Sequence, residues 1–392
     1  MIHNYTVTGN PMPSKPLPKS TNTHNSWSVR MVNSILHQYS IEQAEWHYEH
    51  GLMVKAIAEV GKAFGENRFI EFSQDWIDHF VRPDGTIRSF YFDEFTLDQV
   101  NPGKLLFQLY QSTGADRYRK ALALIRSQLH HQPRNASGGF WHKKIYPHQM
   151  WLDGIYMAAP FYAEYANTFD EPVAFDDVTH QIILCEHHTR DPQTGLLFHA
   201  WDESKAQKWA DPITGCSPNF WGRAIGWYVM GLVDVLDFLP PSHKDHTAVL
   251  EILQRLASAL IRYQDSRTGL WYQIVDAAGK PGNYAESSVS AMLAYGFAKG
   301  VRKGWLGSET LLSAQRAYRG LLENQIKVDA QGLLTLENTC GVGGLGGVPY
   351  RDGSYEYYIS EKIITNDFKG VGPFVLAALE LETADILIPS SD

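Results

Sequence analysis

Apolar residues recur at helical spacing through residues 146 to 170, on more than one side of the predicted helix. One stripe contains Leu152, Tyr156, Ala159 and Ala163, and a second contains Trp151, Ile155 and Ala158. Spacings of three and four residues predict a helix, and a helix that is apolar on nearly every side lies inside a protein. A single carboxylate, Asp153, stands near its start. A buried aspartate needs a partner or a function. We therefore expect this helix to lie at the centre of the fold, with Asp153 as either a paired or a functional residue.

A similar pattern is repeated along the chain. Glycine-centred turns each lead into a short apolar or aromatic stretch, a loop and two helical segments. The glycines that mark these turns are Gly85, Gly139, Gly195, Gly269 and Gly332. Their intervals of 54 to 74 residues are long for a solenoid repeat and fit a helical hairpin with a functional loop. With the helices before the first turn as one more unit, we predict six hairpins closed in an (α/α)6 barrel, with loops and inner-helix N-termini at one end.

Residues 1 to 26 differ in composition from the rest of the chain. Four prolines lie there among Ser, Thr, Asn and Lys, which is typical of a flexible arm. The apolar pattern begins after this stretch, with helices expected at 27 to 39, 46 to 64 and 68 to 81. We therefore expect a flexible N-terminal arm at residues 1–26 and a single (α/α)6-barrel domain at residues 27–392.

Carboxylates stand where predicted loops run into predicted inner helices. Asp98 precedes Asn101 and Pro102, residue types that suit an N-cap and a first helical position. Its carboxylate would then lie near the positive end of a helix, although a capping or turn aspartate is the commoner role at such a place. Asp153 stands at the next junction among Trp and Tyr, where an apolar setting would raise the pKa of a carboxyl group and make it a proton donor.

An arginine between two tryptophans marks a third junction. Arg223 and Trp227 are four residues apart and share a helix face, and Trp221 stands just before them. A guanidinium fork beside stacking surfaces suits the carboxylate and ring of an acidic sugar. A structural arginine packed on aromatic rings is the alternative, and the residues alone do not choose between these roles.

Two other motifs do not indicate phosphate or metal sites. The glycine-rich stretch 341–347 has no βαβ unit around it and no Gly-Lys-Ser/Thr after it, so it is not a phosphate-binding loop. We expect it to be a mobile rim loop over the cavity. Cys185, His187 and His188 lack the ligand spacing of a zinc site, because adjacent histidines on a helix cannot easily face one ion. We expect no metal.

Composition narrows the class of protein. The 392 residues are 44% hydrophobic, enough for a large core, and 12% aromatic, which suits sugar-binding platforms as well as an aromatic core. A net charge of −9 without a basic run argues against nucleic acid. No stretch is long and apolar enough to predict a membrane span. Three dispersed cysteines and the lack of a signal-peptide pattern predict a cytoplasmic protein.

Three motifs carry a resemblance to a known family. They are Gln-Met-Trp-Leu-Asp-Gly at 149–154, Trp-Gly-Arg-Ala-Ile-Gly-Trp at 221–227 and Pro-Tyr-Arg-Asp-Gly-Ser-Tyr-Glu-Tyr-Tyr at 349–358. On the six-hairpin pattern, they make residues 27 to 384 similar to glycoside hydrolase family 105. These are the unsaturated rhamnogalacturonyl hydrolases, which are related to the unsaturated glucuronyl hydrolases of family 88. One departure is Ile225, where relatives often carry Asn.

The resemblance implies a fold and an unusual reaction. Members of this family form an (α/α)6 barrel and remove the non-reducing 4,5-unsaturated uronic acid that polysaccharide lyases leave on oligosaccharides. One aspartate donates a proton to carbon 4, water adds at carbon 5, and the resulting hemiketal opens and breaks the glycosidic bond. By this resemblance Asp153 is the acid and then the base, and Asp98 is the second carboxylate, which positions the sugar hydroxyls or the water.

The resemblance also implies the other site residues and the substrate. The substrate-binding residues would be His142, Lys143, Met157, His199, Trp221, Arg223 and Trp227. His199 and Arg223 would bind the uronate carboxylate, and Met157 and Trp221 would form the pocket wall. The substrate would be an unsaturated uronyl disaccharide or short oligosaccharide, foremost unsaturated galacturonyl-rhamnose, and no cofactor would be needed. The next sugar along and the oligomeric state stay open.

Three other functions stay open as well. An ordinary inverting glycosidase would use Asp98 and Asp153 as acid and base across a saturated bond. A sugar epimerase on a similar helical toroid would need two histidines flanking one carbon and would release no monosaccharide. A non-catalytic sugar-binding protein would bind the same ligand, and Asp153→Asn would leave that binding intact.

Overall fold

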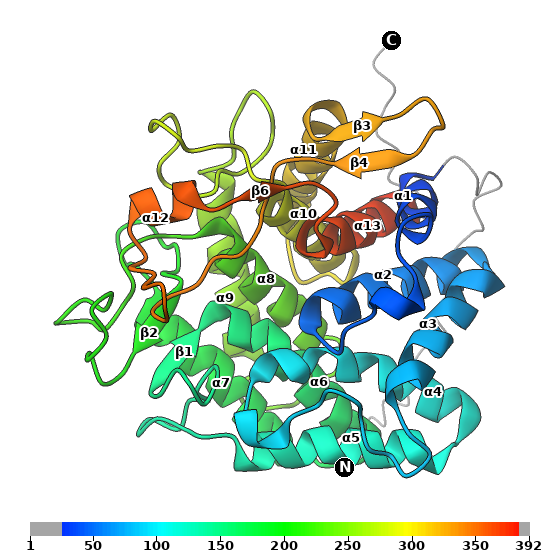
Figure 1. Ribbon diagram of the computed structural model, residues 1–392. Coiled ribbons are helices and arrows are strands. Elements are labelled where there is room, and N and C mark those ends of the chain that lie inside the picture. The colour runs from blue at the N-terminus through cyan, green and yellow to red at the C-terminus, as the bar shows by residue number, and fades with distance from the viewer. Residues whose placement is uncertain (1–25, 384–392) are drawn as a thin grey trace, which may run out of the picture.

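Six helices form the inner wall of a closed ring in the computed structural model, which describes residues 26–383 (Figure 1). In chain order they are α2 (Tyr48–Phe64), α4 (Lys104–Thr113), α6 (Leu152–Thr168), α8 (Gly222–Val235), α10 (Ser287–Arg302) and α13 (Phe368–Thr383). Each helix packs against the next, and α13 packs against α2. The inner ring is therefore continuous.

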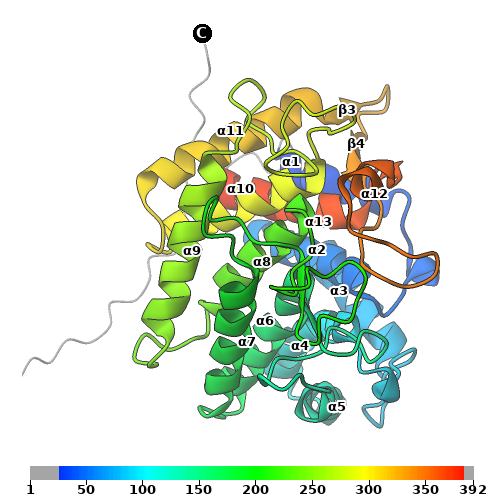
Figure 2. The same ribbon diagram turned by 90° about the vertical axis from the view of Figure 1, so that its left-hand side faces the viewer.

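A second layer of helices covers this ring from outside (Figure 2). Its members are α1 (Trp27–Leu36), α3 (Asn67–Phe80), α5 (Asp116–His131), α7 (Ala174–Thr189), α9 (His246–Ile261) and α11 (Ser308–Asn324). Across residues 26–383, each outer helix packs mainly against one inner helix, which makes six helical pairs. The predicted (α/α)6 barrel is confirmed. No helix in this described range is long and apolar enough to cross a membrane.

The last helical pair is built from both ends of the described chain. The outer helix α1 packs along the inner helix α13. Near the end of α13, Glu382 accepts hydrogen bonds from the Ser26 hydroxyl at 2.5 Å and from the Trp27 backbone N–H at 2.7 Å. The predicted arm at residues 1–26 lies outside the described residues except for Ser26, whose side chain caps α1.

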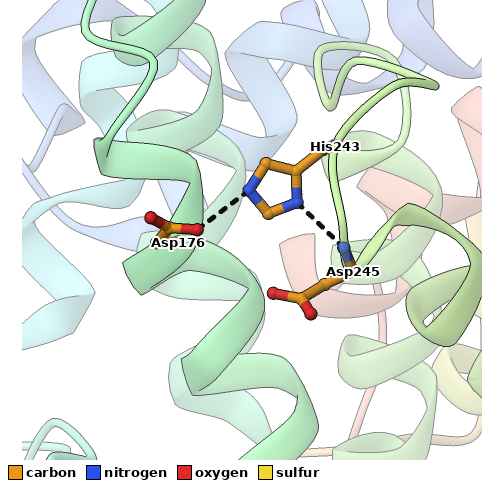
Figure 3. A group of neighbouring side chains, drawn as sticks. All are labelled: Asp176, His243 and Asp245. Atoms are coloured by element: carbon orange, nitrogen blue, oxygen red, sulfur yellow. Dashed lines mark hydrogen bonds and ion pairs between the residues drawn. The ribbon is translucent and has the colours of Figure 1, made fainter.

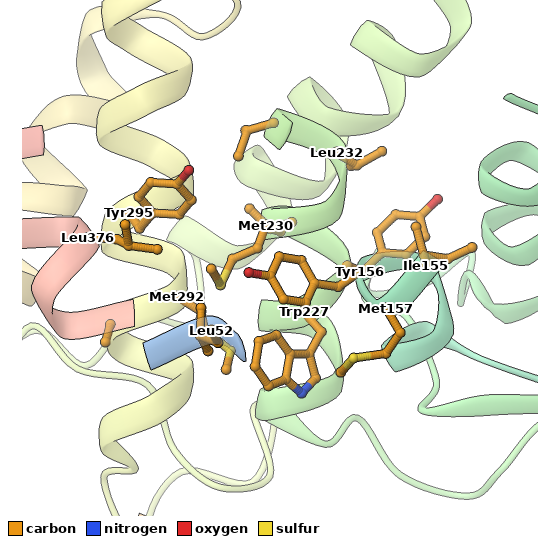
Figure 4. Packing of buried hydrophobic residues seen from close by; sticks show 14 of the residues in the cluster. Leu52, Ile155, Tyr156, Met157, Trp227, Met230, Leu232, Met292, Tyr295 and Leu376 are labelled. Carbon is orange, nitrogen blue, oxygen red and sulfur yellow. The ribbon is translucent and has the colours of Figure 1, made fainter. Parts of the chain in front are cut away.

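The helix predicted from the apolar stripes is the buried centre of the barrel wall. In α6, 13 of 17 residues are buried, and Asp153 lies in the first turn. Tyr156 of α6 stacks on Trp227 of α8 with ring centres 4.8 Å apart, and Met157 lies beside the same indole (Figure 4). Aromatic packing of this kind stabilises a buried contact beyond its area alone. It fixes α6 against α8 and so holds the first turn of α6 in place.

Short strands, 3-10 turns and one short helix lie in the loops between the barrel helices. Strand β1 (Gln149–Trp151) pairs antiparallel with β2 (Ala200–Asp202), β3 (Ile326–Val328) with β4 (Leu334–Leu336), and β5 (Thr339–Cys340) with β6 (Ile363–Ile364). The remaining elements are the 3-10 turns η2 (Ile41–Gln43), η3 (Phe92–Glu94), η4 (Leu97–Gln99) and η5 (Asn101–Gly103) and the short helix α12 (Tyr355–Ser360). The β1–β2 pair joins the loop before α6 to the loop before α8.

Candidate active site

The inner helices begin at one end of the barrel, and side chains from neighbouring helix starts meet there. Lys369 at the start of α13 lies 2.9 Å from Glu49 at the start of α2. Arg223 at the start of α8 lies 3.3 Å from Glu286, which precedes α10. Helix N-termini carry a partial positive charge and favour anions. This end of the barrel is therefore suited to an anionic ligand.

Asp98 lies in η4 and is surrounded by basic side chains. The Lys143 Nζ lies 2.5 Å from its Oδ2, the His142 Nε2 3.6 Å from its Oδ1, and the His47 Nε2 4.0 Å from its Oδ2. Burial by itself would raise the pKa of Asp98, but the Lys143 ammonium, followed by His142 and His47, lowers it to about 2. Asp98 is therefore an anion at neutral pH.

The prediction that Asn101 caps a helix is wrong. Asn101 lies inside η5, and its side-chain Nδ2 donates to the Tyr156 carbonyl of α6 at 3.3 Å. Backbone bonds from Val100 to Leu97 and from Gly103 to Val100, both 3.0 Å long, wind residues 97–103 into two successive 3-10 turns. Such tight turns are common before a helix. They bring Asp98 into the barrel mouth and tie this segment to α6.

His142 connects the Asp98 region with the loop before α6. Its ring stacks on Trp151, with centres 4.7 Å apart and planes at 11°. Burial lowers the pKa of His142 to about 4, because it outweighs the attraction of Asp98. His142 is therefore neutral at pH 7 and can donate one hydrogen bond and accept another.

Asp153 and His199 face each other across the β1–β2 connection. The Leu152 N–H donates to the His199 carbonyl at 3.0 Å, and the His199 Nε2 lies 3.1 Å from the Asp153 Oδ2. Both atoms are buried, and neither makes a well-aligned hydrogen bond with any residue in the described part of the chain. The Asp153 side chain keeps 13% of its surface exposed. The Asp153 carboxyl group is therefore accessible to a ligand and has hydrogen-bonding capacity left for it.

Tyr358 of α12 decides which nitrogen of His199 carries the proton. The Tyr358 hydroxyl lies 2.7 Å from the His199 Nδ1, its one hydrogen-bond partner among residues 26–383. Burial raises the pKa of Tyr358 well above its usual value, so the phenol keeps its proton and needs an acceptor. We assign the hydroxyl as donor to Nδ1, which leaves the ring proton on Nε2, facing Asp153.

The Arg223 guanidinium is turned toward the protein. Its Nε donates to the Ser288 hydroxyl at 2.8 Å, its Nη1 to the Gly341 carbonyl at 3.0 Å, and its Nη2 to the Glu286 Oε1 at 3.3 Å and to the Cys340 carbonyl. Only 1% of Arg223 is exposed. These contacts favour the structural role, in which Arg223 joins α8 to α10 and to the glycine-rich segment. Its contact with a uronate carboxylate stays a prediction.

The predicted wall residues are buried near these groups. Trp221 stacks on Tyr358, with ring centres 5.6 Å apart and planes at 21°, and its ring centre lies 4.8 Å from that of His199. Trp227 meets Tyr48 edge to face at 6.0 Å. Trp221 therefore lies in the region of His199. Trp227 packs beside Met157 and Tyr156 in the buried wall between α6 and α8 (Figure 4).

Sequence reasoning missed His47, Tyr48 and Tyr358. Burial raises the pKa of Tyr48 well above its usual value, and its ring contacts that of His47 at 4.4 Å. His47 and Tyr48 stand at the start of α2, the same kind of junction that singled out the two aspartates, so that rule could have found them. Tyr358 ends one of the family motifs, but nothing in a single sequence shows that it reaches a histidine 159 residues away.

A cleft of about 710 Å³ opens beside Asp98. Trp46 and His47, Asp98, and Lys143 contribute to its wall from three different loops. Its volume falls in the range of small-molecule sites in proteins. The structure therefore offers room for a ligand next to the ionised carboxylate.

Comparison with known proteins establishes the family. A sequence model of the Glycosyl Hydrolase Family 88 matches residues 27–384. The chain belongs to this family. It is therefore a glycoside hydrolase, as the sequence predicted.

Individual relatives agree with this assignment. A solved glycoside hydrolase of family 105 from C. acetobutylicum is 45% identical, with a TM-score of 0.89, and the match covers 92% of this chain and 100% of that one. Protein Atu3128 of Agrobacterium fabrum is 40% identical over 232 residues, 57% of this chain and 97% of that protein. The unsaturated rhamnogalacturonyl hydrolase YesR of Bacillus subtilis is 29% identical over 255 residues, 64% of this chain and 69% of YesR. The predicted resemblance to families 105 and 88 is confirmed.

One group of possible metal ligands lies in the outer layer of helices, among the residues that the structure describes. Asp176, His243 and Asp245 gather near the starts of α7 and α9 (Figure 3). The His243 Nε2 lies 3.3 Å from Asp176, its Nδ1 accepts the Asp245 backbone N–H at 3.2 Å, and Lys244 lies 2.7 Å from Asp176. The ligand atoms are thus engaged with the protein, and a lysine competes for the carboxylate. We assign no ion to this group.

Gly343, in the glycine-rich segment 341–347, packs closely against Trp221 of the candidate active site. A Cβ at Gly343 would collide with the Cζ2, Cη2 and Cε2 atoms of Trp221. Gly343→Ala is therefore expected to displace the indole from Tyr358 and to lower kcat/KM by roughly tenfold, because a displaced wall residue misplaces the substrate. Steady-state kinetics and tryptophan fluorescence would detect both effects. Gly332→Ala has open space around it but strains a left-handed turn with φ of 82°, so it should lower stability and leave kinetics unchanged. Wild-type kinetics in Gly343→Ala would contradict the expectation.

Proposed function

We propose that this hydrolase removes the 4,5-unsaturated uronic acid from the non-reducing end of lyase-generated oligosaccharides. The foremost substrate would be unsaturated galacturonyl-rhamnose. The observation that carries this proposal is the pairing of Asp153 with His199 in the same mouth as Asp98, which is held ionised by Lys143. The relatedness to YesR, an unsaturated rhamnogalacturonyl hydrolase, supports the substrate class.

The proposed reaction begins with protonation of a carbon atom. Asp153 donates its proton to carbon 4 of the enol ether, and positive charge develops at carbon 5 and the ring oxygen. A preorganised anion stabilises such a charge, and Asp98 is an anion at neutral pH. The Asp153 carboxylate then takes a proton from water as it adds to carbon 5. The hemiketal formed in this way opens, and the glycosidic bond breaks.

His199 would control the proton state of Asp153 during this cycle. With its proton on Nε2, His199 can donate to the Asp153 carboxylate after proton transfer and so stabilise the base form that activates water. Lys143 would act mainly through Asp98 by keeping it charged, since its ammonium lies 2.5 Å from that carboxylate. His142, Met157, Trp221 and Trp227 would surround the sugar, and Arg223 would support the pocket or reach the uronate.

The proposal is tested by following the ultraviolet absorbance of the conjugated enol ether in unsaturated galacturonyl-rhamnose. The wild-type enzyme should abolish this absorbance and release rhamnose, and it should leave the saturated disaccharide intact. Cleavage of the saturated disaccharide with persistent absorbance in the unsaturated one would establish an ordinary inverting glycosidase. If the absorbance persists and no monosaccharide is released from either sugar, the epimerase and the binding protein become the candidates.

Tyr358→Phe tests the proposed role of the tyrosine hydroxyl. Without the donor to Nδ1, His199 is no longer held in one tautomer, so kcat is expected to fall by about fivefold to tenfold, the worth of one hydrogen bond of about 1 kcal/mol. KM should change little, and the nitrogen-15 NMR shifts of His199 should change from the Nε2–H form to a mixture. Tyr355→Phe is the matched control, because the Tyr355 hydroxyl on the same helix donates to backbone carbonyls of residues 280 and 281. Unchanged NMR shifts and kcat in Tyr358→Phe would refute the role.

The location of the enzyme stays a prediction. Cys185, Cys216 and Cys340 are buried free thiols, a state that fits a reducing compartment. We therefore propose a cytoplasmic enzyme that acts on small saccharides. Fractionation of cells that produce the full chain would test this.

A further inference from the structure

We propose that the end of the barrel opposite the mouth contains a second binding site, which takes the anion of a small hydroxy acid. The site is a cavity of about 320 Å³, lined mainly by the C-terminal parts of the inner helices α2, α6, α8, α10 and α13. Neither Asp98 nor Asp153 lines it. The inference is therefore independent of the proposed reaction, which uses none of the lining groups.

The Lys104 side chain reaches this cavity from the start of α4, directly after η5. Only 7% of Lys104 is exposed, and its Nζ lies 3.8 Å from the centre of the Tyr156 ring. Tyr156 stacks on Trp227, and Trp227 in turn meets Tyr48 at the start of α2. Along this series of contacts, aromatic rings separate the Lys104 ammonium group from the mouth.

Two buried atoms of the lining need a hydrogen-bond partner. The Lys104 Nζ is a donor and the Asp234 Oδ2 is an acceptor, and neither has a partner among residues 26–383. Both residues line the cavity. A buried polar group without a hydrogen bond destabilises the fold. A ligand with a carboxylate for Lys104 and a hydroxyl group for Asp234 would satisfy both atoms.

The other charges of the cavity are mostly paired with one another. Its cations are Lys55, Lys104, Lys299, Arg302 and Lys303, and its acids are Glu59, Glu164, Asp234, Asp237 and Glu380. Ion pairs join Lys299 to Asp234 and to Asp237 at 2.6 Å, Lys303 to Asp237 at 2.5 Å, Arg302 to Glu380 at 2.6 Å and Lys55 to Glu59 at 3.5 Å. The Tyr295 hydroxyl also donates to the Asp234 Oδ1, at 2.7 Å. Within the described range, Lys104 is thus the lining cation that is left for a ligand.

Lys104 and Glu164 set the net charge of the cavity near neutral pH. Burial lowers the pKa of Lys104 to about 7, because it outweighs the attraction of Asp234. Burial raises the pKa of Glu164 to about 7, in spite of the ammonium groups of Lys55 and Lys104. The remaining four cations and four acids balance. Below pH 7 the protonated Lys104 and the neutral Glu164 leave one positive charge, which an anion with one negative charge would neutralise.

The cavity fits a small organic anion better than a metal ion. No three of its carboxylates come within ligand distance of one another in the part of the chain that the structure describes. Five basic side chains also share this space. A volume of about 320 Å³ exceeds the needs of one water molecule and lies at the lower end of small-molecule sites.

The test measures the binding of glycolate, acetate and glycolamide to the full chain by calorimetry. Glycolate should bind at pH 6 with a Kd of about 1 mM, a scale that suits so small a ligand. Acetate lacks the hydroxyl group and should bind about fivefold more weakly. Glycolamide lacks the charge and should not bind. Between pH 6 and pH 8 the affinity for glycolate should fall by about tenfold or more, because Lys104 loses its proton and Glu164 becomes charged while glycolate stays ionised.

Two variants of Lys104 locate the anion. Lys104→Met removes the ammonium group and should abolish the binding of glycolate. Lys104→Arg stays charged at every pH of the test and should bind glycolate at pH 8 more tightly than the wild type does. The matched control is Lys120→Met on α5, which removes a lysine whose side chain is 51% exposed and should keep wild-type binding.

Each contrary result overturns a defined part of the inference. Glycolate binding that survives Lys104→Met and competes with the unsaturated disaccharide would place the anion at the mouth. Equal affinities for acetate and glycolate would overturn the role of the hydroxyl group, and equal binding of glycolamide would overturn the role of the charge. No binding to the wild type would mean that the cavity takes up water only. If Lys104→Met does not fold, the pH profiles of the wild type and Lys104→Arg decide.

Discussion

Asp153→Asn is expected to lower kcat on unsaturated galacturonyl-rhamnose by about a thousandfold or more, the scale on which a general acid and base contributes. The amide keeps the shape of the carboxyl group but cannot give a proton to carbon 4 or take one from water. Substrate affinity should stay within a few fold, because His199 and the buried wall residues remain. Loss of the enol ether absorbance gives the rate, and calorimetry gives the affinity.

The control for this substitution lies on the same helix. Glu164 belongs to α6 but lines a separate polar cavity with Asp234 and Lys299. Glu164→Gln removes a carboxyl group from α6 without touching the mouth, so its kcat should match that of the wild type. A near-normal rate in Asp153→Asn would assign the proton transfer to another residue, and His142 and Asp98 would be the next to examine.

Asp98→Asn is expected to lower kcat by about a hundredfold, because a preorganised charge facing the developing cation is lost. The amide fits the same space, but the Lys143 ammonium then has no counter-charge close by. It would add positive charge where the transition state is itself positive. Adding Lys143→Met to Asp98→Asn should therefore recover part of the rate, and kinetics of the two single variants and the double variant measure this coupling. Independent, additive effects would contradict the pairing.

Asp98 also makes stability depend on pH in a defined window. The pKa of Asp98 is about 2 in the folded protein, below the value of about 3.9 for an unfolded chain. A depressed pKa contributes stability that is fully present above the unfolded value and is lost as the pH falls toward 2. Urea midpoints of the wild type should therefore fall more between pH 5 and pH 3 than those of Asp98→Asn. Equal falls would show that Asp98 is not charged in the folded enzyme.

The barrel and the position of helix α6 could be predicted because both depend on local patterns. Apolar residues at spacings of three and four identified α6, and its first turn places Asp153 at the mouth, since every inner helix starts there. The prediction for Asn101 failed because the choice between a capped helix and two 3-10 turns depends on packing against Tyr156 of α6. Local propensity does not contain that contact.

The pairing of side chains could not be predicted from one sequence. His199 meets Asp153 because two strands of three residues pair in one register, and strands this short carry too little pattern to fix it. The partners of Arg223 are two backbone carbonyls, a serine and Glu286, all distant in sequence. Because the local sequence does not reveal these partners, Arg223 could be interpreted as a ligand-binding arginine. Functional geometry thus arose from long-range contacts, whereas the helices arose from local ones.

The pairing of α1 with α13 bears on how the enzyme is made in a cell. A ribosome releases α1 before the rest of the barrel, and α13 becomes available only after the eleven helices α2 to α12 have been synthesised. Until then α2 and α10 lack the neighbour that separates them in the finished ring, and their apolar faces stay open to water. Contacts between such distant segments give a high contact order and slow folding, and exposed apolar faces invite chaperones. A nascent chain stalled before α13 should therefore be chaperone-bound and unable to bind substrate.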